Sequence, residues 1–492
     1  MKRYEHFIDG KAVAPQSGSY FPTNEPYSGE AWAEIARGTP EDVDLAMASA
    51  ETAFRAREWR DITATKRGEI LRRFADLIVE NADALGKIEQ RDNGKLIAEV
   101  SGQVRNVAQW FYYYAGLADK TSGQVIPINK PGTFNYIKYE PLGVIVAITP
   151  WNSPLALTAW KLAPALAAGN TVVVKPSEFT SASLIELARI AIEAGLPKGV
   201  FNVVTGFGHE IGDALVRHPL ARKIAFTGGE VGGRAVNVAA AEELKPVTLE
   251  LGGKSPNVIL ADADIDQAVK GVVSGIFGAS GQTCMAGSRL LLHRSIHDDV
   301  IARLIEILKG AKIGDPALMD TQIGPIATPS QLEKILSYID IAKSEGATCA
   351  YGGYRLEGPE YGAGQFVAPT IFTDVRNDMR IAQEEVFGPV LSVMSFEDDE
   401  EALRIANDTR FGLAAAVWTQ NLERSMYFAD RLEAGTVWVN NYRSTSFTTT
   451  FGGYKDSGIG REGGPDAMRE FQHEKSVWIT PRPGRDNPFV LG

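Results

Sequence analysis

The sequence predicts an α/β fold, and three observations support that prediction. From 143 to 251 short apolar runs alternate with helical stretches, and a second series of the same kind follows from 255 to about 440. Apolar runs this continuous are typical of strands buried on both faces, and hence of a parallel sheet covered by helices. A chain of 492 residues is also too long for one simple core, so two large domains are expected.

The first part of the chain adds smaller elements before this series. Residues 6–13, HFIDGKAV, predict a short strand pair. Apolar positions three and four apart, as in ILRRFADLIVENADAL, predict helices between Pro40 and about Ala118. Residues 121–140 predict two strands, the second of which ends in FNYIKYE.

The first α/β series contains a well-marked helix start. Ser153-Pro154 predicts it, because Ser is a favoured cap and Pro is favoured at the first helical position. We place a domain boundary near Gly252-Gly253, a glycine pair between two strand-like runs. The predicted strands are GVIVAIT, TVVVK, FNVV, KIAF and VTLEL, and the predicted helices span 154–168, 181–194, 209–217 and 231–241.

The second series repeats the alternation of strands and helices. From Phe451 onward the sequence FGGYKDSGIGREGG predicts a loop, and 470–481 predicts a last strand. The predicted strands are SPNVIL, SRLLLH, PVLSVMSF, AAAVW and GTVWVN, and the predicted helices span 264–278, 298–309, 330–346, 399–407 and 422–432.

Composition argues against several classes of protein. Lys and Arg total 50 against 61 Asp and Glu, so a nucleic-acid partner is not expected. No segment offers about 20 uninterrupted apolar residues and the first residues lack the core of a signal peptide, so no membrane span or secretion is expected. The two cysteines cannot make a disulfide framework and suit a reducing cytoplasm. The six histidines make no zinc-type spacing, so no metal site is predicted.

Cys284 is the candidate nucleophile. It lies in GASGQTCMAGS, where glycines and small residues let backbone N–H groups approach the sulfur. Oriented N–H dipoles lower a thiol pKa from about 8.5 and so favour the reactive thiolate. The alternative is a buried, unreactive cysteine, and we assign that role to Cys349 in GATCAYGG.

Glu250 and Asn152 are candidates for the remaining chemistry. No histidine belongs to a recognisable Cys-His signature, so a carboxylate with a raised pKa would have to activate water against a thioester. Glu250 ends an apolar run before a glycine pair, where apolar neighbours would raise its pKa; the alternative is an exposed carboxylate at a strand end. Asn152, between a strand and a helix start in TPWNSPL, could donate its amide to an oxyanion.

Two segments are candidates for nucleotide binding. Lys175 and Glu178 in VVVKPSE follow a strand end, where ligands of open α/β sheets bind, and they could hold an adenosine ribose; the alternative is a surface ion pair. FTGGEVGGRA leads from a strand into a helix, so its N–H groups could hold a pyrophosphate. The G-x-x-x-x-G spacing of Gly228 to Gly233 lacks the Lys-Ser/Thr of a nucleoside triphosphatase, and no G-x-S-x-G elbow occurs.

Together these segments resemble the aldehyde dehydrogenase superfamily. The matching pieces are TPWNSPL, KPSE, FTGGEVGG, LELGGKSPN, GQTCMAGSR, EEVFGPV and FGGYKDSGIGRE, in the family's order from about 150 to 462. The resemblance implies a Rossmann-like cofactor domain (1–119 and 141–252), an α/β catalytic domain (253–467) and a small β oligomerisation arm (120–140 and 468–492).

The same resemblance implies a role for each site residue. Cys284 would be the nucleophile and Glu250 the general base, while Asn152 and the backbone N–H of Cys284 would form the oxyanion hole. The implied cofactor-binding residues are Trp151, Lys175, Glu178, Gly228, Gly229, Gly233, Glu385 and Phe387. In one departure, Gly229 stands where the family often has Ser, and the loop carries an additional glycine, Gly232.

The implied function is NAD-dependent oxidation of an aldehyde to its acid through a thioester on Cys284. We expect NAD rather than NADP, because Glu178 sits where a 2′-phosphate would be placed and the two anions would repel. The implied protein is a cytoplasmic homodimer or homotetramer. The arm at 121–140 would offer an edge with which a partner chain can pair.

The substrate side is predicted from the loop 441–451, NYRSTSFTTTF, which by resemblance borders the entrance. Its hydroxyls and Arg443 favour a polar or carboxylate-bearing aldehyde such as a semialdehyde, since burying them against a long alkyl chain costs free energy. Leu157, Trp160 and Phe451 would supply apolar faces near the reacting carbon. The alternative for Arg443 is a contact with a neighbouring chain or with water.

Three other functions remain open at this point. The thioester could be transferred to coenzyme A, although members of that branch typically lack the glutamate base that Glu250 supplies here. The chain could be a non-catalytic structural protein on the same fold, against which the intact set of Cys284, Glu250, Asn152 and Glu385 argues. It could also bind an aldehyde or a nucleotide without turnover.

Overall fold

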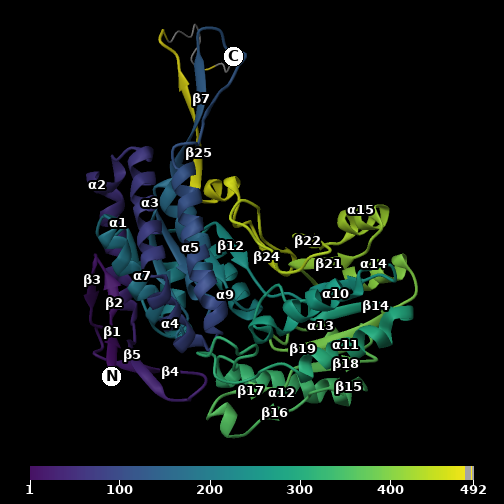
Figure 1. Ribbon diagram of the computed structural model, residues 1–492. Helices are drawn as coiled ribbons and strands as arrows, with labels where there is room; N and C mark the ends of the chain where they lie inside the picture. Colours follow the sequence, from purple (N-terminus) through teal and green to yellow (C-terminus); the bar gives the residue numbers. More distant parts are fainter. Residues whose placement is uncertain (483–488, 490–492) are drawn as a thin grey trace.

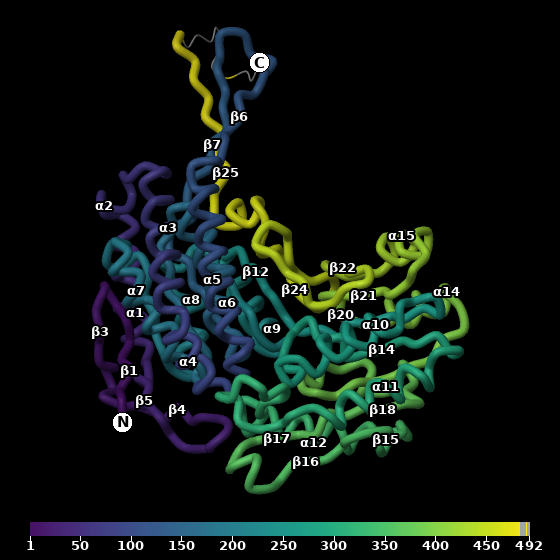
Figure 2. Tube along the Cα trace, in the orientation of Figure 1, coloured from purple at the N-terminus to yellow at the C-terminus, as the bar shows by residue number. Residues whose placement is uncertain are grey.

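The computed structural model describes residues 1–482 and Phe489, arranged as two lobes and a projecting arm (Figure 1). The N-terminal half of the chain forms one lobe, and the green segments of the C-terminal half form the other (Figure 2). Both lobes contain a sheet with helices packed on it. The predicted α/β class is therefore confirmed.

The first lobe is built on an eight-stranded sheet of order β24-β12-β11-β8-β9-β10-β2-β3. The strands from β12 to β10 run parallel, and β24, β2 and β3 are antiparallel additions. Their carboxyl ends meet at one edge, which is where ligands of such sheets bind. The bounds are β2 (His6–Ile8), β3 (Lys11–Val13), β8 (Val144–Ile148), β9 (Thr171–Lys175), β10 (Phe201–Val203), β11 (Ala221–Thr227), β12 (Val247–Glu250) and β24 (Gly458–Ile459).

Helices cover both faces of this sheet. Alternate residues of the central strands pack into two separate cores, one with α3, α5, α6 and α7 and the other with α1, α8 and α9. Helix α6 is apolar on every side apart from Lys161, which is why it is buried along nearly its whole length. The bounds are α1 (Pro40–Arg55), α2 (Arg57–Arg60), α3 (Ala64–Glu80), α4 (Ala82–Asn93), α5 (Ile97–Leu117), α6 (Pro154–Ala168), α7 (Ala182–Glu193), α8 (Gly208–Arg217) and α9 (Glu230–Glu242).

The second lobe contains a seven-stranded sheet of order β15-β18-β19-β14-β13-β21-β22. All its pairings are parallel except that of β15. Its strands are β13 (Pro256–Ile259), β14 (Arg289–His293), β15 (Thr348–Tyr351), β18 (Thr370–Thr373), β19 (Val390–Phe396), β21 (Ala414–Trp418) and β22 (Thr436–Val439). Its helices are α10 (Ile265–Val272), α11 (His297–Lys309), α12 (Pro329–Ser344), α13 (Arg380–Gln383), α14 (Asp399–Asn407) and α15 (Leu422–Arg431).

The arm is a three-stranded antiparallel sheet of order β25-β7-β6 that rises from the first lobe (Figure 1). Its strands are β6 (Gln124–Val125), β7 (Phe134–Pro141) and β25 (Gln472–Ile479), which confirms the strands predicted at 121–140 and 470–481. Apolar side chains of the arm are exposed, among them Val125, Phe134, Trp478 and Ile479. Of the predicted arm, residues 483–488 and 490–492 lie outside the described part of the chain.

The smaller sheets link the larger units. Strands β1 (Lys2–Tyr4), β5 (Ala31–Ala36) and β4 (Tyr20–Asn24) form one, and β16 (Arg355–Leu356) with β17 (Phe366–Val367) another. Strand β20 (Phe411–Gly412) pairs with β23 (Tyr454–Lys455). The segment predicted as a loop after Phe451 thus contains β23 and β24, and β24 adds a strand to the sheet of the other lobe.

One predicted helix was wrong at its end. The structure ends α10 at Val272 instead of continuing it to 278. A π-helical turn over Val273–Phe277 and a tight turn over Gly278–Gly281 follow. Inserted π turns of this kind occur frequently at functional sites. The chain enters the segment of Cys284 directly from this irregular stretch.

Candidate active site

A cavity of about 140 Å³ lies at the carboxyl edge of the first sheet, and the second lobe closes it. It brings together residues that lie up to 237 positions apart, from Pro150 to Phe387. Among the residues predicted from the sequence, its lining includes Trp151, Asn152, Leu157, Gly228, Gly229, Glu250, Cys284, Glu385 and Phe387. The rest of the lining was not predicted from the sequence as part of the site: Pro150, Thr227, Leu251, Gly252, and Gln331 and Lys334 of α12.

The loop before Cys284 has an unusual backbone. Ala279, Ser280 and Gly281 have φ values of 51°, 52° and 70°, a left-handed run that is rare for residues with side chains. A side chain at Gly281 would lie 2.1 Å from the carbonyl oxygen of Gly388. Glycine therefore lets the nucleophile loop press against the segment that carries Glu385 and Phe387.

The electrostatic surroundings of Cys284 differ from the prediction. Burial, followed by the carboxylates of Glu250 and Glu385, raises its pKa to about 12. The backbone N–H groups of Cys284 and Met285 act in the predicted, lowering direction, but burial outweighs them. The expected net fall in the thiol pKa was thus wrong for the protein alone.

Asn152 is buried at the turn between β8 and α6, with its amide fixed. Its Nδ2 donates to the carbonyl oxygen of Gln282 at 3.0 Å, two residues before Cys284 in the chain. An amide nitrogen has two N–H donors, so one stays available to a ligand. The amide of Asn152 is therefore rigidly attached to the nucleophile loop.

Glu250 ends β12 and is 4% exposed. Neither of its carboxylate oxygens has a hydrogen-bond partner among the residues that the structure describes. Burial and the nearby Glu462 raise its pKa well above the ordinary value, while Lys161 and Arg461 act in the opposite direction. The predicted raised pKa is confirmed in direction, and a buried carboxylate without partners is suited to accept a proton.

A buried ion pair lies next to Glu250. The Nζ of Lys161, in α6, donates to Glu462 Oε1 at 2.6 Å and to Thr227 Oγ1 at 2.5 Å. This pair was not predicted from the sequence. The signal was present for Lys161, which is the one charged residue in the apolar run PLALTAWKLAPALAA. The neighbouring sequence GREGG gives no sign that Glu462 is paired, because its partner lies 301 positions away.

Glu385 is held by the glycine pair that we predicted as a domain boundary. The backbone N–H of Gly253 donates to its Oε1 at 3.0 Å, and a side chain at Gly252 would collide with its Oε2 at 2.2 Å. Burial raises the pKa of Glu385, and the Gly253 N–H lowers it. Gln331 fixes the following residues by donating to the carbonyl oxygens of Val386 and Phe387 at 2.8 and 2.9 Å.

The aromatic rings of Trp151 and Phe387 pack against each other in the lining of the cavity. Their centroids lie 5.3 Å apart with the planes at 84°, an edge-to-face arrangement. Phe387 has a φ of 59°, so its ring is aimed by a backbone conformation that is uncommon for a bulky residue. The two rings give the cavity an apolar surface in the same lining as Glu385.

A second hollow of about 330 Å³ lies along the same sheet edge, between α8 and α9. Lys175 lines it, and its Nζ lies 3.0 Å from the carbonyl oxygen of Pro176 and 3.4 Å from Glu178 Oε2. Burial lowers the pKa of Lys175. Apolar residues including Val216, Phe226 and Val236 form the rest of the lining, which suits a flat aromatic ring.

The predicted glycine loop joins the two hollows at the start of α9. Gly233 packs on Leu251, since a side chain there would lie 2.4 Å from Leu251 Cδ2, and Gly228 packs on Phe226 in the same way at 2.7 Å. Gly229 is different: it caps α9 with an ordinary φ of −71°, and a side chain there would meet nothing within 4 Å. Gly229 is also exposed, and the first N–H groups of a helix that begins at such a residue can bind an anion.

The predicted apolar faces form an aromatic cluster behind Leu157. The ring of Trp160 stacks on Trp110 of α5 at 4.8 Å and meets Phe451 edge to face at 5.2 Å. Trp160 and Phe451 are largely buried and belong to the core against which Cys284 packs. Trp110 was not predicted as a site residue.

Arg443 is already paired within its own chain. Its Nη2 donates to Glu99 Oε1 at 3.0 Å and its Nη1 to the carbonyl oxygen of Ser274 at 3.0 Å. The guanidinium lies over Gly278, where a side chain would collide with Nη1 at 2.1 Å. Sequence analysis missed Glu99 as its partner, because the two lie 344 positions apart.

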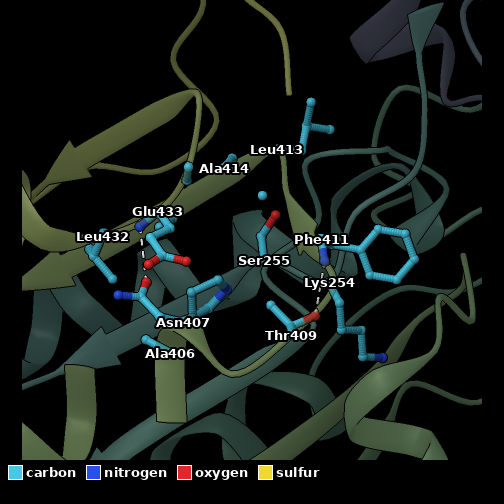
Figure 3. Close-up of a pocket in the computed structure, with 14 residues that line it drawn as sticks. Lys254, Ser255, Ala406, Asn407, Thr409, Phe411, Leu413, Ala414, Leu432 and Glu433 are labelled. Carbon is cyan, nitrogen blue, oxygen red and sulfur yellow. Dashed lines mark hydrogen bonds between the residues drawn. The ribbon is translucent and has the colours of Figure 1, made fainter. Parts of the chain in front are cut away.

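A third pocket is unsuited to a ligand of any size. It is lined by Lys254, Asn407, Phe411 and Glu433 among others, and its volume of about 10 Å³ holds about one water molecule (Figure 3). Burial and the nearby Arg289 lower the pKa of Lys254 to about 7. Cys349 is also remote from the site, in β15, where its thiol donates to the carbonyl oxygens of Tyr351 and Gly352.

Two features are absent from the described part of the chain. Within residues 1–482 and Phe489, no group of three or more His, Cys, Asp or Glu side chains is arranged to hold a metal ion. Over the same residues, no helix combines the length and the apolar character that crossing a membrane requires.

Comparisons with known proteins give a consistent result. The sequence model of the aldehyde dehydrogenase family matches residues 13–477. An aldehyde dehydrogenase of Aspergillus niger is 45% identical over 472 residues, covering 96% of this chain and 94% of the relative. The solved structure of betaine aldehyde dehydrogenase from Staphylococcus aureus in complex with NAD+ is 40% identical, with a TM-score of 0.97 over 99% of this chain and 97% of the other. An NAD+ complex of an aldehyde dehydrogenase from Bacillus cereus is 42% identical, with a TM-score of 0.95 and coverages of 98% and 97%.

Proposed function

The chain belongs to the aldehyde dehydrogenase family and is an NAD-dependent enzyme of that family, and we propose that Cys284, Glu250 and Asn152 carry its chemistry. One observation carries the assignment. A thiol and a buried carboxylate without hydrogen-bond partners among the described residues line the same cavity. A fixed amide also lines it. Thioester formation and hydrolysis need these three groups.

The reaction proceeds in two stages. The thiol of Cys284 loses its proton to water, and the thiolate attacks the aldehyde carbon. The resulting oxyanion is held by the free N–H of Asn152 and by the backbone N–H of Cys284. NAD, when bound, supplies the acceptor for the hydride that leaves this carbon, and a thioester remains on Cys284. Glu250 then takes a proton from water, the hydroxide attacks the thioester, and the acid departs as the thiol is restored.

The residues present fit the cofactor. Glu385 has one carboxylate oxygen fixed on the Gly253 N–H and would accept from a ribose hydroxyl with the other. The first N–H groups of α9, after its cap Gly229, would bind the pyrophosphate. Lys175 and Glu178 would bind the adenosine ribose beside the apolar hollow. Trp151, Gly228, Gly233 and Phe387 would shape the path between them.

The division of labour follows the two lobes. Residues 1–119 and 141–252 would bind the cofactor, residues 253–467 would carry the nucleophile, and residues 120–140 with 468–492 would form the arm, of which 483–488 and 490–492 lie outside the described part of the chain. The pairing of β24 with β12 supports a fixed relation between the first two units, because a segment of the second completes the sheet of the first.

The substrate is a polar aldehyde, with two candidates for its distal group. A carboxylate, as in a semialdehyde, would bind Arg443 in competition with Glu99. A quaternary ammonium group would instead face the rings of Trp160 and Phe451 through cation–π attraction. The second candidate is favoured by the similarity to a relative named for betaine aldehyde.

The protein acts as a homodimer or homotetramer in the cytoplasm. The projecting arm supports assembly, because its exposed Val125, Phe134, Trp478 and Ile479 would be covered by a second copy. Sedimentation that finds an active monomer would contradict the assembly, and fractionation of cells tests the compartment.

The test of the function is turnover by the purified protein with NAD and a panel of aldehydes, read as reduced cofactor. We expect oxidation of polar aldehydes, loss of turnover in Cys284→Ala, and an acid product that needs no coenzyme A. If the product were an acyl-coenzyme A thioester, formed only when coenzyme A is present, the enzyme would belong to the acyl-transfer branch. Binding of NAD without any turnover would favour a binding or structural protein.

A further inference from the structure

The last residue of α4, Asn93, and Lys95 beyond it contact the segment that carries Asn152. The Nδ2 of Asn93 donates to the carbonyl oxygen of Trp151 at 3.4 Å, and the Nζ of Lys95 donates to Ser153 Oγ at 2.5 Å. The two contacts lie on either side of Asn152. Neither acceptor, Trp151 or Ser153, belongs to α6, the helix that begins at Pro154.

The hydroxyl of Ser153 does not cap the helix that follows it. Ser at the cap of a helix normally accepts from a backbone N–H of the first turn. Ser153 occupies the cap of α6, but its side chain makes no such bond. Its oxygen accepts from Lys95 instead. The Ser-Pro helix start was thus predicted at the right position, whereas the role of its hydroxyl was not.

Lys95 is itself held in place. Its side chain is buried, and its Nζ also donates to Gln103 Oε1 of α5 at 2.8 Å. Its backbone N–H donates to Asn93 Oδ1 at 3.0 Å, which links the two residues that contact the Asn152 segment. Helices α5 and α6 lie side by side and pack against each other (Figure 2), and Lys95 connects Gln103 of α5 to Ser153 at the cap of α6.

We infer that Lys95 is a positioning residue for the oxyanion hole, acting through Ser153 on the amide of Asn152. This inference rests on the proposed function. The amide is fixed on its other side by Gln282, in the loop of Cys284. The oxyanion donor is therefore held between the nucleophile loop and the Lys95 contact.

A buried amino group must keep its hydrogen bonds, because a donor left without a partner costs free energy, so the Lys95–Ser153 contact resists opening. Burial lowers the pKa of Lys95, while the carboxylates of Glu99 and Glu89 act in the opposite direction. Loss of the contact would free the turn before α6. A displacement of about 1 Å in a catalytic group can slow a reaction by about 100-fold.

The experiment is a double-mutant cycle on first-turnover hydride transfer, measured as the burst of reduced cofactor. Lys95→Met keeps the length of the side chain and removes the donor, and we expect the burst to slow by about 10- to 100-fold. Asn152→Ala should slow it by about 100- to 1,000-fold. In the Asn152→Ala background, Lys95→Met should change the rate by less than about threefold, because the amide that it positions is gone.

Three controls separate positioning from general damage. The affinity for NAD should stay within about twofold in Lys95→Met, since it makes no contact with the cofactor hollows. Ser153→Ala removes the acceptor and keeps the lysine, costs no helix cap, and should slow the burst in the same way; it replaces Lys95→Met if that variant does not fold. Lys343→Met, which removes a lysine bound to the carbonyl oxygen of Gly353, should leave the rate unchanged.

The outcomes are distinguishable. A Lys95→Met burst equal to the parent's, or a loss that multiplies fully with that of Asn152→Ala, overturns the positioning role while the proposed function stands. An unmodified protein that never reduces NAD with any aldehyde overturns the proposed function, and the positioning role with it.

Discussion

The Nζ of Lys161 lies 2.6 Å from Glu462 Oε1, and this buried pair has opposite effects on the pKa of Glu250. Glu462 raises that pKa and Lys161 lowers it. The second carboxylate oxygen of Glu462 has no partner among the described residues. The pair therefore adjusts the proton affinity of the proposed base.

The first prediction concerns the pH dependence of thioester hydrolysis. A base works only when deprotonated, so the rate falls as the pH drops below the pKa of Glu250. Glu462→Gln removes the charge that raises this pKa, and the acid limb should move to lower pH. The measurement is the rate of acyl-enzyme hydrolysis against pH, with Glu470→Gln, the partner of Lys223, as the matched control.

Lys161→Met should move the acid limb of the hydrolysis rate in the opposite direction, to higher pH. That change leaves Glu462 buried and unpaired, which costs about 3–5 kcal/mol of stability. The double variant Lys161→Met/Glu462→Gln removes both charges and should recover much of that loss. If the acid limb of the pH–rate profile moved in the same direction in both single variants, this would contradict the assignment of Glu250 as the base.

The second prediction separates the two stages of the reaction. Glu250→Gln keeps the shape of the side chain and loses the base, so hydride transfer should occur once and stop. We expect a burst of about one reduced cofactor per active site and an acyl adduct on Cys284 by mass spectrometry. Undiminished steady turnover without an adduct would exclude Glu250 from this role.

The third prediction concerns the thiol. Because burial and two carboxylates raise the pKa of Cys284 to about 12, little thiolate exists near neutral pH in the protein alone. Its alkylation by iodoacetamide should therefore rise by about tenfold for each pH unit between about pH 7 and pH 9, without reaching a plateau. Cys284→Ala supplies the background from Cys349. A plateau below pH 9 would show that the N–H dipoles outweigh burial.

Much of the fold could be predicted because local patterns of apolar residues in the sequence determine it. The parallel strands β8, β9, β11 and β12 are continuous apolar runs between helices, and such runs leave few other structures. Strands β15 and β18 were missed, because four residues without strong alternation give little periodicity. The end of α10 was missed for a different reason: its helical pattern continues while tertiary packing imposes a π turn.

The site could be predicted where each residue lies in a motif, and not where it depends on a distant partner. Cys284, Glu250 and Asn152 stand in short, informative segments, and the cavity brings them together. Glu99 carries no local sign of its pairing with Arg443. The pKa of Cys284 was predicted in the wrong direction, because sequence reveals neighbouring glycines but not the depth of burial.

The fourth prediction concerns the choice of cofactor. Glu178 lies three residues after Lys175, the last residue of β9, with its carboxylate 3.4 Å from the Nζ of that lysine. A 2′-phosphate placed there would meet this anion in a partly desolvated site, so NAD should be preferred by at least about tenfold. Glu178→Thr should narrow the preference, while Lys175→Met should weaken both cofactors. Equal specificity constants for NAD and NADP in the parent would refute it.

The last prediction concerns the distal group of the substrate. Arg443 is partly neutralised by Glu99, whose Oε1 also accepts from Gln103 at 2.9 Å. If a substrate carboxylate binds Arg443, it competes with Glu99 for the guanidinium. Arg443→Ala should then lower the preference for a semialdehyde over a neutral aldehyde of equal length by about tenfold, and Glu99→Gln should raise it, since one charged hydrogen bond is worth about 1.5–3 kcal/mol.

The Glu99→Gln change is the sharper of the two, because it removes only a charge. Glutamine keeps an oxygen that can accept from Gln103, so α5 should remain undisturbed. The measurement is the ratio of the two specificity constants, with a quaternary ammonium aldehyde as a third substrate. Opposite changes in the two variants would assign Arg443 to substrate selection. An unchanged semialdehyde ratio, together with a preference for the ammonium aldehyde that falls in Trp160→Leu, would assign selection to the aromatic cluster instead.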